Sequence, residues 1–287
     1  MPKLGYGRLQ QCCVWLMLLA WSVSGVRAEP SAAMTSYEFG VVPQQSARQL
    51  AEDWGPLLAE VGRRAGVTLV FHTTANIPLF EEHLGKKEYD FAYMNPYHYV
   101  VFHKAAGYLA YAKEKDRKIK GVIVVRKDSA YKHLQDLRGK EVAFPAPAAF
   151  AASIMTQAEF GRHTIAIKSK FVSSHDSVYR AVAAGLAEAG GGIPRTFEAM
   201  PAEIHDQLRV LVETPSFTPH AFAAQQRVPK AVVARVSAAL LSLSDDEVGR
   251  TLLAAVSFKN GMAAAQDRDW NDIRQLDIKL LARYTRE

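Results

Sequence analysis

Cysteine is nearly absent from this sequence of 287 residues, and both copies lie close to its beginning. Cys12 and Cys13 precede or begin a short apolar run, and no cysteine follows them. If this initial segment is removed, the remaining chain has no disulfide, no thiolate nucleophile and no cysteine ligand for a metal ion.

The N-terminal apolar run, from Cys13 to Trp21, is also too short for a comfortable membrane span. It follows the basic residues Lys3 and Arg8 and precedes Val26-Arg27-Ala28, which resembles a cleavage site. This order is typical of a secretory signal, so we predict a cleaved signal peptide over residues 1–28. An uncleaved N-terminal anchor is the alternative. A lipoprotein is not expected, because its cysteine would follow the apolar run.

Motifs of several enzyme classes are missing as well. The sequence contains no G-x-S-x-G, no phosphate loop of the form G-x-x-x-x-G-K-[ST], and no H-E-x-x-H. Ser174-His175-Asp176 has the residue types of a catalytic triad, but sequence neighbours rarely build one. We therefore expect no enzyme, no catalytic residues and no cofactor.

A metal site has little support in the sequence. His98 and His103 are five residues apart, which is a poor spacing for two ligands on one helical face. Met94, His98 and His220 would suit copper if they converged. A metal carrier therefore stays open as a minor alternative, and no metal site is predicted.

What the chain does contain is ordinary globular composition, with 49% hydrophobic and 22% charged residues. This length is enough for two modest lobes with proper cores. Removal of Lys3, Arg8 and Arg27 with the signal lowers the formal charge from +6 to +3. Such a charge weakly favours an anionic ligand and does not indicate nucleic acid.

Strand and helix patterns alternate along most of the chain. Strands are predicted at 37–42, 67–71 and 91–94, with helices between them, and further strands at 108–113, 120–126 and 141–144. An Ala-rich helix is expected at 148–160, and helices alone are expected after Pro229, including one over 270–284. This alternation predicts an α/β fold with mainly parallel sheets.

A second α/β run interrupts the first, which indicates two lobes. We assign residues 34–125 plus 221–287 to lobe one and residues 126–220 to lobe two. The crossing strands near 124–127 and 217–222 would form a hinge, with a ligand cleft between the lobes.

The segment from Tyr89 to Tyr99 joins a buried strand to a helix. Asn95 suits the helix N-cap and Pro96 the first helical position, and the helix should stop at Gly107. Free backbone N–H groups at such a junction can bind anions. An ordinary core strand and helix, with the aromatic residues as packing, would give the same pattern.

This segment resembles D-[FL]-A-[YFW]-x-[NG]-P-x-x-[YV] of the periplasmic substrate-binding proteins of the phosphate/phosphite/phosphonate type. Five further segments resemble the family in the expected order: 39–43, 54–57, 121–129, 136–144 and Ser174-His175-Asp176. The resemblance implies a two-lobe, type II periplasmic-binding-protein-like fold in the periplasm.

The resemblance also implies a function: capture of a small anionic ligand, either phosphate/phosphite/phosphonate-like or another oxyanion or organic acid, for an ABC importer. The expected partner is then a membrane permease, with the binding protein itself a monomer. A ligand-sensing protein coupled to a membrane sensor kinase is the alternative, because the same fold serves both roles.

Candidate ligand-binding residues come from both lobes. His175 aligns with a histidine that contacts the anion in relatives, and Arg195 could supply a bidentate fork to an anion. The complete predicted set is Tyr93, Asn95, Tyr97, Phe150, Ser153, Ser174, His175 and Arg195.

The sequence departs from the family where relatives carry a Ser-Thr-Ser-type run that cradles the phosphonate. The matching positions here are Ala149, Phe150 and Ala151, so the backbone donors remain but the hydroxyls are lost. Each lost hydrogen bond to a charged group is worth about 1.5–3 kcal/mol. We therefore expect phosphate and simple alkylphosphonates to bind weakly, and Phe150 to favour a ligand with an apolar part.

Overall fold

A computed structural model describes residues 34–285 of the chain. The predicted signal peptide, with Cys12 and Cys13, lies outside the described residues. None of the helices within 34–285 combines the length and the apolar character that crossing a membrane requires.

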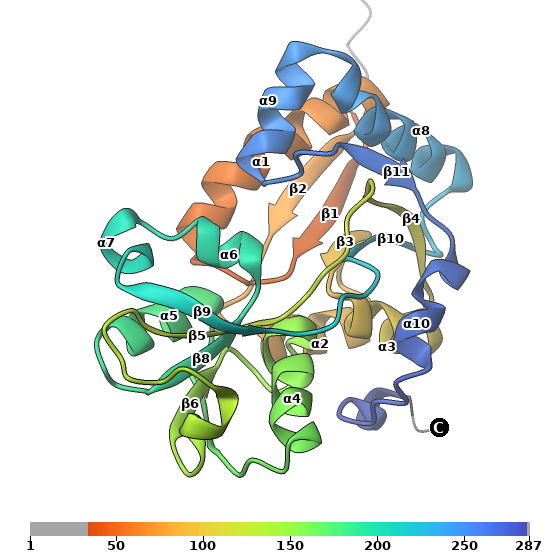
Figure 1. The fold of residues 1–287 in the computed structure, drawn as a ribbon. Helices are drawn as coiled ribbons and strands as arrows, with labels where there is room; N and C mark the ends of the chain where they lie inside the picture. The colour runs from red at the N-terminus through yellow and green to blue at the C-terminus, as the bar shows by residue number, and fades with distance from the viewer. Residues whose placement is uncertain (1–33, 286–287) are drawn as a thin grey trace, which may run out of the picture. The chain divides into compact units, whose positions relative to one another are not determined.

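Six strands form the first sheet, in the order β11-β4-β10-β3-β1-β2 (Figure 1). Strand β1 pairs in parallel with both β2 and β3, whereas β10 is antiparallel to β3 and β4, and β11 is antiparallel to β4. The strands are β1 (Ser36–Val41), β2 (Thr68–His72), β3 (Phe91–Met94), β4 (Tyr108–Glu114), β10 (Ala221–Gln225) and β11 (Met262–Ala264).

The helices associated with this sheet form two groups. The first group packs together and comprises α1 (Ala47–Ala65), α8 (Lys230–Leu241) and α9 (Glu247–Ala255). The second group comprises α2 (Ile77–Gly85), α3 (Pro96–Ala106) and α10 (Asn271–Arg274). Figure 1 shows α1, α8 and α9 together and α3 beside α10.

Five strands form the second sheet, in the order β7-β6-β8-β5-β9. They are β5 (Val122–Arg126), β6 (Glu141–Phe144), β7 (Lys168–Phe171), β8 (Ala189–Gly192) and β9 (Leu208–Glu213). Strand β6 is parallel to β7 and β8, and β5 is antiparallel to β8 and β9. The helices of this part are α4 (Thr156–Arg162), α5 (His175–Ala183), α6 (Pro194–Glu198) and α7 (Ala202–His205). The α/β prediction is confirmed, but the expectation of mainly parallel sheets was wrong. Four strand pairings are parallel and five are antiparallel, because β10 and β5 each run against both of their neighbours and β11 runs against β4.

The chain passes between the two sheets twice, through residues 115–121 and 214–220. Ile119 and Phe217 join these crossing segments by two backbone hydrogen bonds of 2.8 Å. Because β5 pairs within the second sheet, the first crossing ends before Val122.

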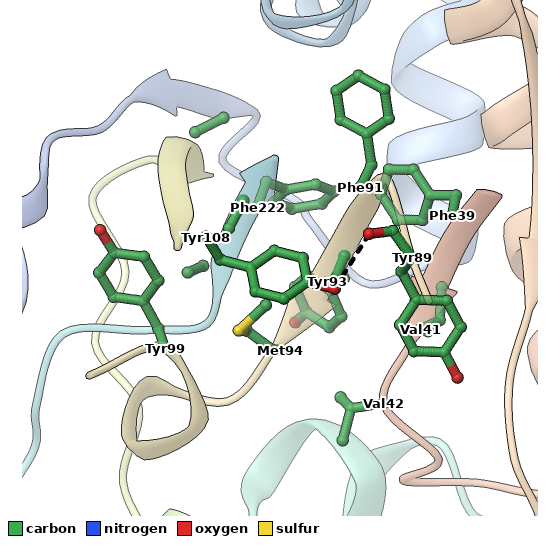
Figure 2. Close-up of a cluster of buried hydrophobic side chains, with 14 of the residues drawn as sticks. Phe39, Val41, Val42, Tyr89, Phe91, Tyr93, Met94, Tyr99, Tyr108 and Phe222 are labelled. Atoms are coloured by element: carbon green, nitrogen blue, oxygen red, sulfur yellow. Dashed lines mark hydrogen bonds between the residues drawn. The ribbon is translucent and has the colours of Figure 1, made fainter. Parts of the chain in front are cut away.

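Aromatic rings from three neighbouring strands make the core of the first sheet (Figure 2). Phe39 of β1 stacks on Phe91 of β3 at 6.2 Å between ring centroids, and Phe222 of β10 meets Phe39 edge-on at 6.3 Å. The hydroxyl of Tyr108 donates to the carbonyl of Tyr89 at 3.0 Å (Figure 2). Large buried rings dominate the packing of such cores. The contacts of these rings therefore fix the position of β3 within the sheet.

Helix α3 begins and ends as local chemistry predicts. The side chain of Asn95 accepts a hydrogen bond from the amide of His98 at 2.8 Å, and Pro96 occupies the first helical position. Gly107 ends the helix with a left-handed φ of 78°, a conformation that glycine adopts at little cost.

Helical predictions were wrong in two places after Pro229. Residues 262–264 form β11, which adds an edge strand to β4. Residues 270–284 do not form one helix: α10 ends at Arg274, and Asp277 has a φ of 48°. Trp270 is fully buried, with its ring N–H donating to the carbonyl of Pro219 at 2.9 Å. The apolar spacing of this segment thus reflects the burial of Trp270, Ile273 and Leu281 and not one continuous helix.

The predicted helix at 148–160 is not regular throughout. Residues 150–155 form a π-helical turn ahead of α4, and π turns often occur at functional sites. Gly191, within β8, lies against this turn. A Cβ on Gly191 would lie 2.1 Å from the carbonyl oxygen of Ala152, so only glycine lets β8 approach the π turn.

Candidate functional site

A small cavity lies where loops from the two sheets meet. Its volume is about 10 Å³, which is room for about one water-sized sphere. No side chain in its lining is an acid, a lysine or an arginine. The lining residues are Val42, Gln44, Ile77, Asn95, Ile119, Ala149, Phe150, Ala151, Ala152, His175, Ile193 and His220.

Three consecutive backbone amides at the start of the π turn belong to residues that line this cavity. The N–H groups of Phe150, Ala151 and Ala152 have no acceptor among residues 34–285, whereas the next amide, of Ser153, donates to Ala149 at 2.8 Å. Unpaired amides at a helix start attract anions. The predicted survival of the backbone donors at these positions is thus in keeping with the structure.

Asn95 faces these amides from the other sheet. Its side-chain oxygen caps α3, and its Nδ2 donates to the carbonyl of Ala148 at 3.1 Å. One side chain therefore fixes the helix start and reaches the segment that precedes the π turn. Its Nδ2 also lies 3.1 Å from Nε2 of His98, so the amide would donate to a bound oxyanion by exchanging one of these internal partners.

His175 is buried at the first position of α5. Its backbone N–H donates to the carbonyl of Gln44 at 3.0 Å, and its Nδ1 lies 3.0 Å from the hydroxyl of Thr196. Burial lowers the pKa of His175 to about 3. The imidazole is therefore neutral at pH 7, with one ring N–H for a hydrogen bond and no charge.

Arg195 lies between the two sheets and already has internal partners. Its guanidinium donates to the hydroxyl of Tyr93 at 2.7 Å and forms an ion pair with Glu114. The guanidinium carbon also lies 4.7 Å from the ring centroid of Phe258, within the range of a cation–π contact. Burial raises the pKa of Tyr93 to about 12, so its hydroxyl stays protonated. The predicted anion fork is thus engaged by protein groups.

Two polar side chains of the lining are absent from the predicted set, namely those of Gln44 and His220. The Nε2 atom of Gln44 lies 3.1 Å from the Nε2 atom of His220, whose ring stacks on Tyr93 at 4.9 Å. Burial, and next the charge of Arg195, keep the pKa of His220 well below its ordinary value. The only sequence signal is that His220 closes a crossing segment, where chain topology places side chains near the cleft.

The two histidines of the copper alternative have protein partners. Among the described residues, no three His, Cys, Asp or Glu side chains are placed to hold a metal ion. His98 lies 3.1 Å from the carboxylate of Glu81, and His220 contacts Gln44.

Besides Tyr93 and Arg195, three more residues of the predicted set do not line the cavity. The hydroxyl of Tyr97 donates to the carbonyl of Ile278 at 3.2 Å and accepts from the amide of Leu281 at 2.9 Å. Ser174 caps α5 by accepting from the amide of Ser177 at 3.1 Å. Ser153 is fully buried, and its hydroxyl has no partner in the part of the chain that is described.

Known structures share this architecture. PhnD1 from Prochlorococcus marinus (MIT 9301), solved with methylphosphonate, has a TM-score of 0.78 at 16% identity, covering 86% of this chain and 98% of its own. A phosphonate-transporter binding protein from Pseudomonas aeruginosa has a TM-score of 0.78 at 15% identity, covering 85% and 86%. A protein from Xanthomonas citri solved with ATP has a TM-score of 0.65 at 16% identity, covering 84% and 95%. These likenesses show the fold and confirm the predicted periplasmic-binding-protein-like architecture.

Sequence comparison identifies the family directly. Among curated proteins, no sequence matches this chain. The family model for the periplasmic phosphonate substrate-binding protein of ABC transporters matches residues 39–270, which is most of the chain. The chain therefore belongs to the family of periplasmic phosphonate-binding proteins of ABC transporters.

Proposed function

We propose that the protein captures a small phosphonate-class oxyanion in the cavity between its two sheets and delivers it to the permease of an ABC importer. The observation that carries this proposal is the row of three unpaired amides at Phe150, Ala151 and Ala152, beside Asn95. Family membership supports it, as does methylphosphonate in PhnD1 from Prochlorococcus marinus. The family favours transport over the sensing role.

In this proposal the amides of the π turn, Asn95 and His175 hold the anion, with Phe150 against its apolar part. Gln44 and His220 complete the wall of the site. Tyr93 and Arg195 act behind them, because they contact each other and, through Tyr93, His220. Tyr97, Ser153 and Ser174 support these elements from outside the cavity.

Entry of a ligand requires motion, because the cavity has room for little more than one water molecule. We propose two lobes that separate about the crossing segments 115–121 and 214–220. The sequence-based division is kept, with its first boundary moved to precede β5. Hinge closure around a ligand is a common motion of two-lobe proteins.

The protein would work as a periplasmic monomer after cleavage following Ala28. The order of basic residues, apolar run and Val26-Arg27-Ala28 supports this step. The intact mass of the exported protein tests it, since a retained N-terminal segment would exclude cleavage there.

Calorimetry with methylphosphonate, phosphite, phosphate and sulfate tests the ligand class, and native mass spectrometry of protein purified from periplasm tests what the chain carries. Binding of at least one phosphonate with one-to-one stoichiometry is expected. Failure of every phosphonate, together with binding of an unrelated solute, would overturn the proposal.

A further inference from the structure

A second, larger pocket adjoins the small cavity. It has a volume of about 430 Å³, which lies within the usual range for small-molecule sites. Ile119, Ile193 and His220 line both the pocket and the cavity, so the two spaces are adjacent. A ligand whose head occupies the cavity can therefore place the rest of its length in this outer pocket.

The charges that line the outer pocket are unevenly paired. Lys120 pairs with Glu213 at 2.5 Å, and Arg195 pairs with Glu114, which lies behind it. Arg117 and Lys118, which are exposed, have no carboxylate within 4.0 Å among residues 34–285. The nearest polar partner of the Lys118 ammonium is the hydroxyl of Thr218 at 3.5 Å.

The acidic side chains of the outer pocket do not cancel its excess of positive charge. Glu198 is the one acidic side chain of the described lining without a basic partner within 4.0 Å, against two such cations. The inner cavity has no acidic side chain at all. A ligand ammonium group would thus meet Arg117 and Lys118 with only Glu198 to offset them, whereas a ligand carboxylate would be attracted.

Apolar groups lie between the unpaired amides of the cavity and the basic side chains of the outer pocket. Ile119 and Ile193 line both spaces, and Pro194 and Pro219 line the outer pocket, so the methylene groups of a ligand would be buried against apolar surface there. A ligand with an anionic head, a short carbon chain and an anionic tail would match this order. Its head would meet the amides, its chain the apolar side chains, and its tail Arg117 and Lys118.

We propose that the outer pocket is a second anion subsite, and that the preferred ligands are phosphonates carrying a carboxylate a few carbons from phosphorus. This inference rests on the proposed function, since it assumes that the phosphonate head occupies the inner cavity. Arg117 and Lys118 select the tail by charge, and the apolar wall accepts the carbon chain.

The test compares ligands of equal length that differ in one charged group. Calorimetry at low salt is run with phosphonoacetate, 3-phosphonopropionate and 4-phosphonobutyrate, each against the alkylphosphonate of the same length, and with 2-aminoethylphosphonate. Each of two exposed ion pairs can raise the affinity by up to about fivefold. At least one carboxylate should therefore bind about five- to tenfold tighter than its alkyl partner, and the aminophosphonate should bind more weakly than its alkyl partner.

Matched variants test whether the tighter binding of the carboxylate depends on the outer pocket. In Arg117→Gln/Lys118→Gln, the ratio between the carboxylate and its alkyl partner should fall to about one. Lys115→Gln removes a charge from the same exposed turn outside the pocket lining and should keep the ratio. In wild type, the ratio should shrink at high salt, because exposed charges are screened.

The outcomes distinguish a failure of the second subsite from a failure of the proposed function. If alkylphosphonates bind and no carboxylate gains, or if the aminophosphonate binds best, the second subsite is wrong and phosphonate capture stands. If no phosphonate binds, both fail. If the double variant keeps the ratio, the carboxylate is held elsewhere and the assignment to Arg117 and Lys118 is overturned.

Discussion

Arg195 and Glu114 form a buried ion pair that joins the two sheets. Glu114 ends β4 of the first sheet and is 4% exposed, while Arg195 follows β8 of the second sheet. Neither side chain has all of its polar atoms hydrogen-bonded, because Oε1 of Glu114 and Nε of Arg195 have no partner within residues 34–285. Burial raises the pKa of Glu114 against the opposing charge of Arg195.

Removal of one partner from this pair should destabilise the protein. Glu114→Gln leaves a buried guanidinium without its counter-charge, which costs about 3–5 kcal/mol in comparable sites. Glu114→Gln/Arg195→Met should recover most of the loss, and Glu52→Gln, at an exposed pair with Arg48, should stay near wild type. Denaturant unfolding measures the three variants. A loss near zero in Glu114→Gln would mean that Arg195 becomes hydrated when the sheets separate.

Acid should weaken the fold through His175. Its folded-state pKa of about 3 lies below the ordinary value of about 6.5, so the unfolded chain binds more protons between these values. The free energy of unfolding therefore falls as the pH falls through this window, by about 1.4 kcal/mol per pH unit for one group. His175→Asn should make the loss between pH 6.5 and 4.5 smaller by about 2–3 kcal/mol.

Denaturant unfolding of wild type and His175→Asn from pH 8 to pH 4.5 checks this pH dependence. At pH 8 both proteins carry a neutral side chain at this position, so their difference there is the pH-independent cost of the substitution. Parallel curves below pH 6.5 would contradict the assigned pKa.

Asn95 should contribute separately to stability and to binding. Asn95→Ala removes the cap of α3 and should cost about 1 kcal/mol of unfolding free energy, together with the donor to the cleft. Asn95→Ser keeps a neutral capping oxygen but loses the amide that donates toward the cleft, so α3 should stay capped while methylphosphonate affinity drops about tenfold or more. Calorimetry and thermal unfolding compare the two. Normal affinity in Asn95→Ser would remove Asn95 from the site.

Gly191 should tolerate no side chain. A Cβ there would lie 2.1 Å from the carbonyl oxygen of Ala152, so Gly191→Ala forces β8 away from the π turn and should cost about 3 kcal/mol or prevent folding. Gly161→Ala is the matched control, because its Cβ would meet no atom within 4 Å in α4. That change should stabilise the protein by about 0.5–1 kcal/mol. Equal thermal stability of the two variants would contradict the packing argument.

Restored hydroxyls should strengthen phosphonate binding. Wild type is expected to bind methylphosphonate only in the high micromolar range, about −5 to −6 kcal/mol. Ala149→Ser/Ala151→Ser adds two donors beside the free amides and should tighten binding by about 1.5–3 kcal/mol for each hydrogen bond formed. Ala158→Ser, on the exposed side of α4, should have no effect. Submicromolar binding by wild type would show that backbone amides alone suffice.

The sequence alone determined the elements whose ends depend on neighbouring residues. Asn95 and Pro96 predicted the start of α3, and Gly107 predicted its end, because caps and left-handed turns are made within a few residues. The order of α/β segments and the five family-like motifs likewise predicted the fold class.

Only the tertiary structure decided the partners of residues that are distant in the chain. Arg195 was predicted as an anion fork, yet it contacts Tyr93 and Glu114, which lie 102 and 81 residues away. Gly191 belongs to a strand because it pairs with Ile123 of β5, and its missing side chain leaves room for the carbonyl of Ala152. Trp270 is fixed by the carbonyl of Pro219, which accepts from its ring N–H, and the helix that follows it ends at Arg274. Local propensity amounts to a few tenths of a kcal/mol per residue, whereas burial of a large side chain contributes about 1.5–3 kcal/mol, so packing prevails where the two disagree.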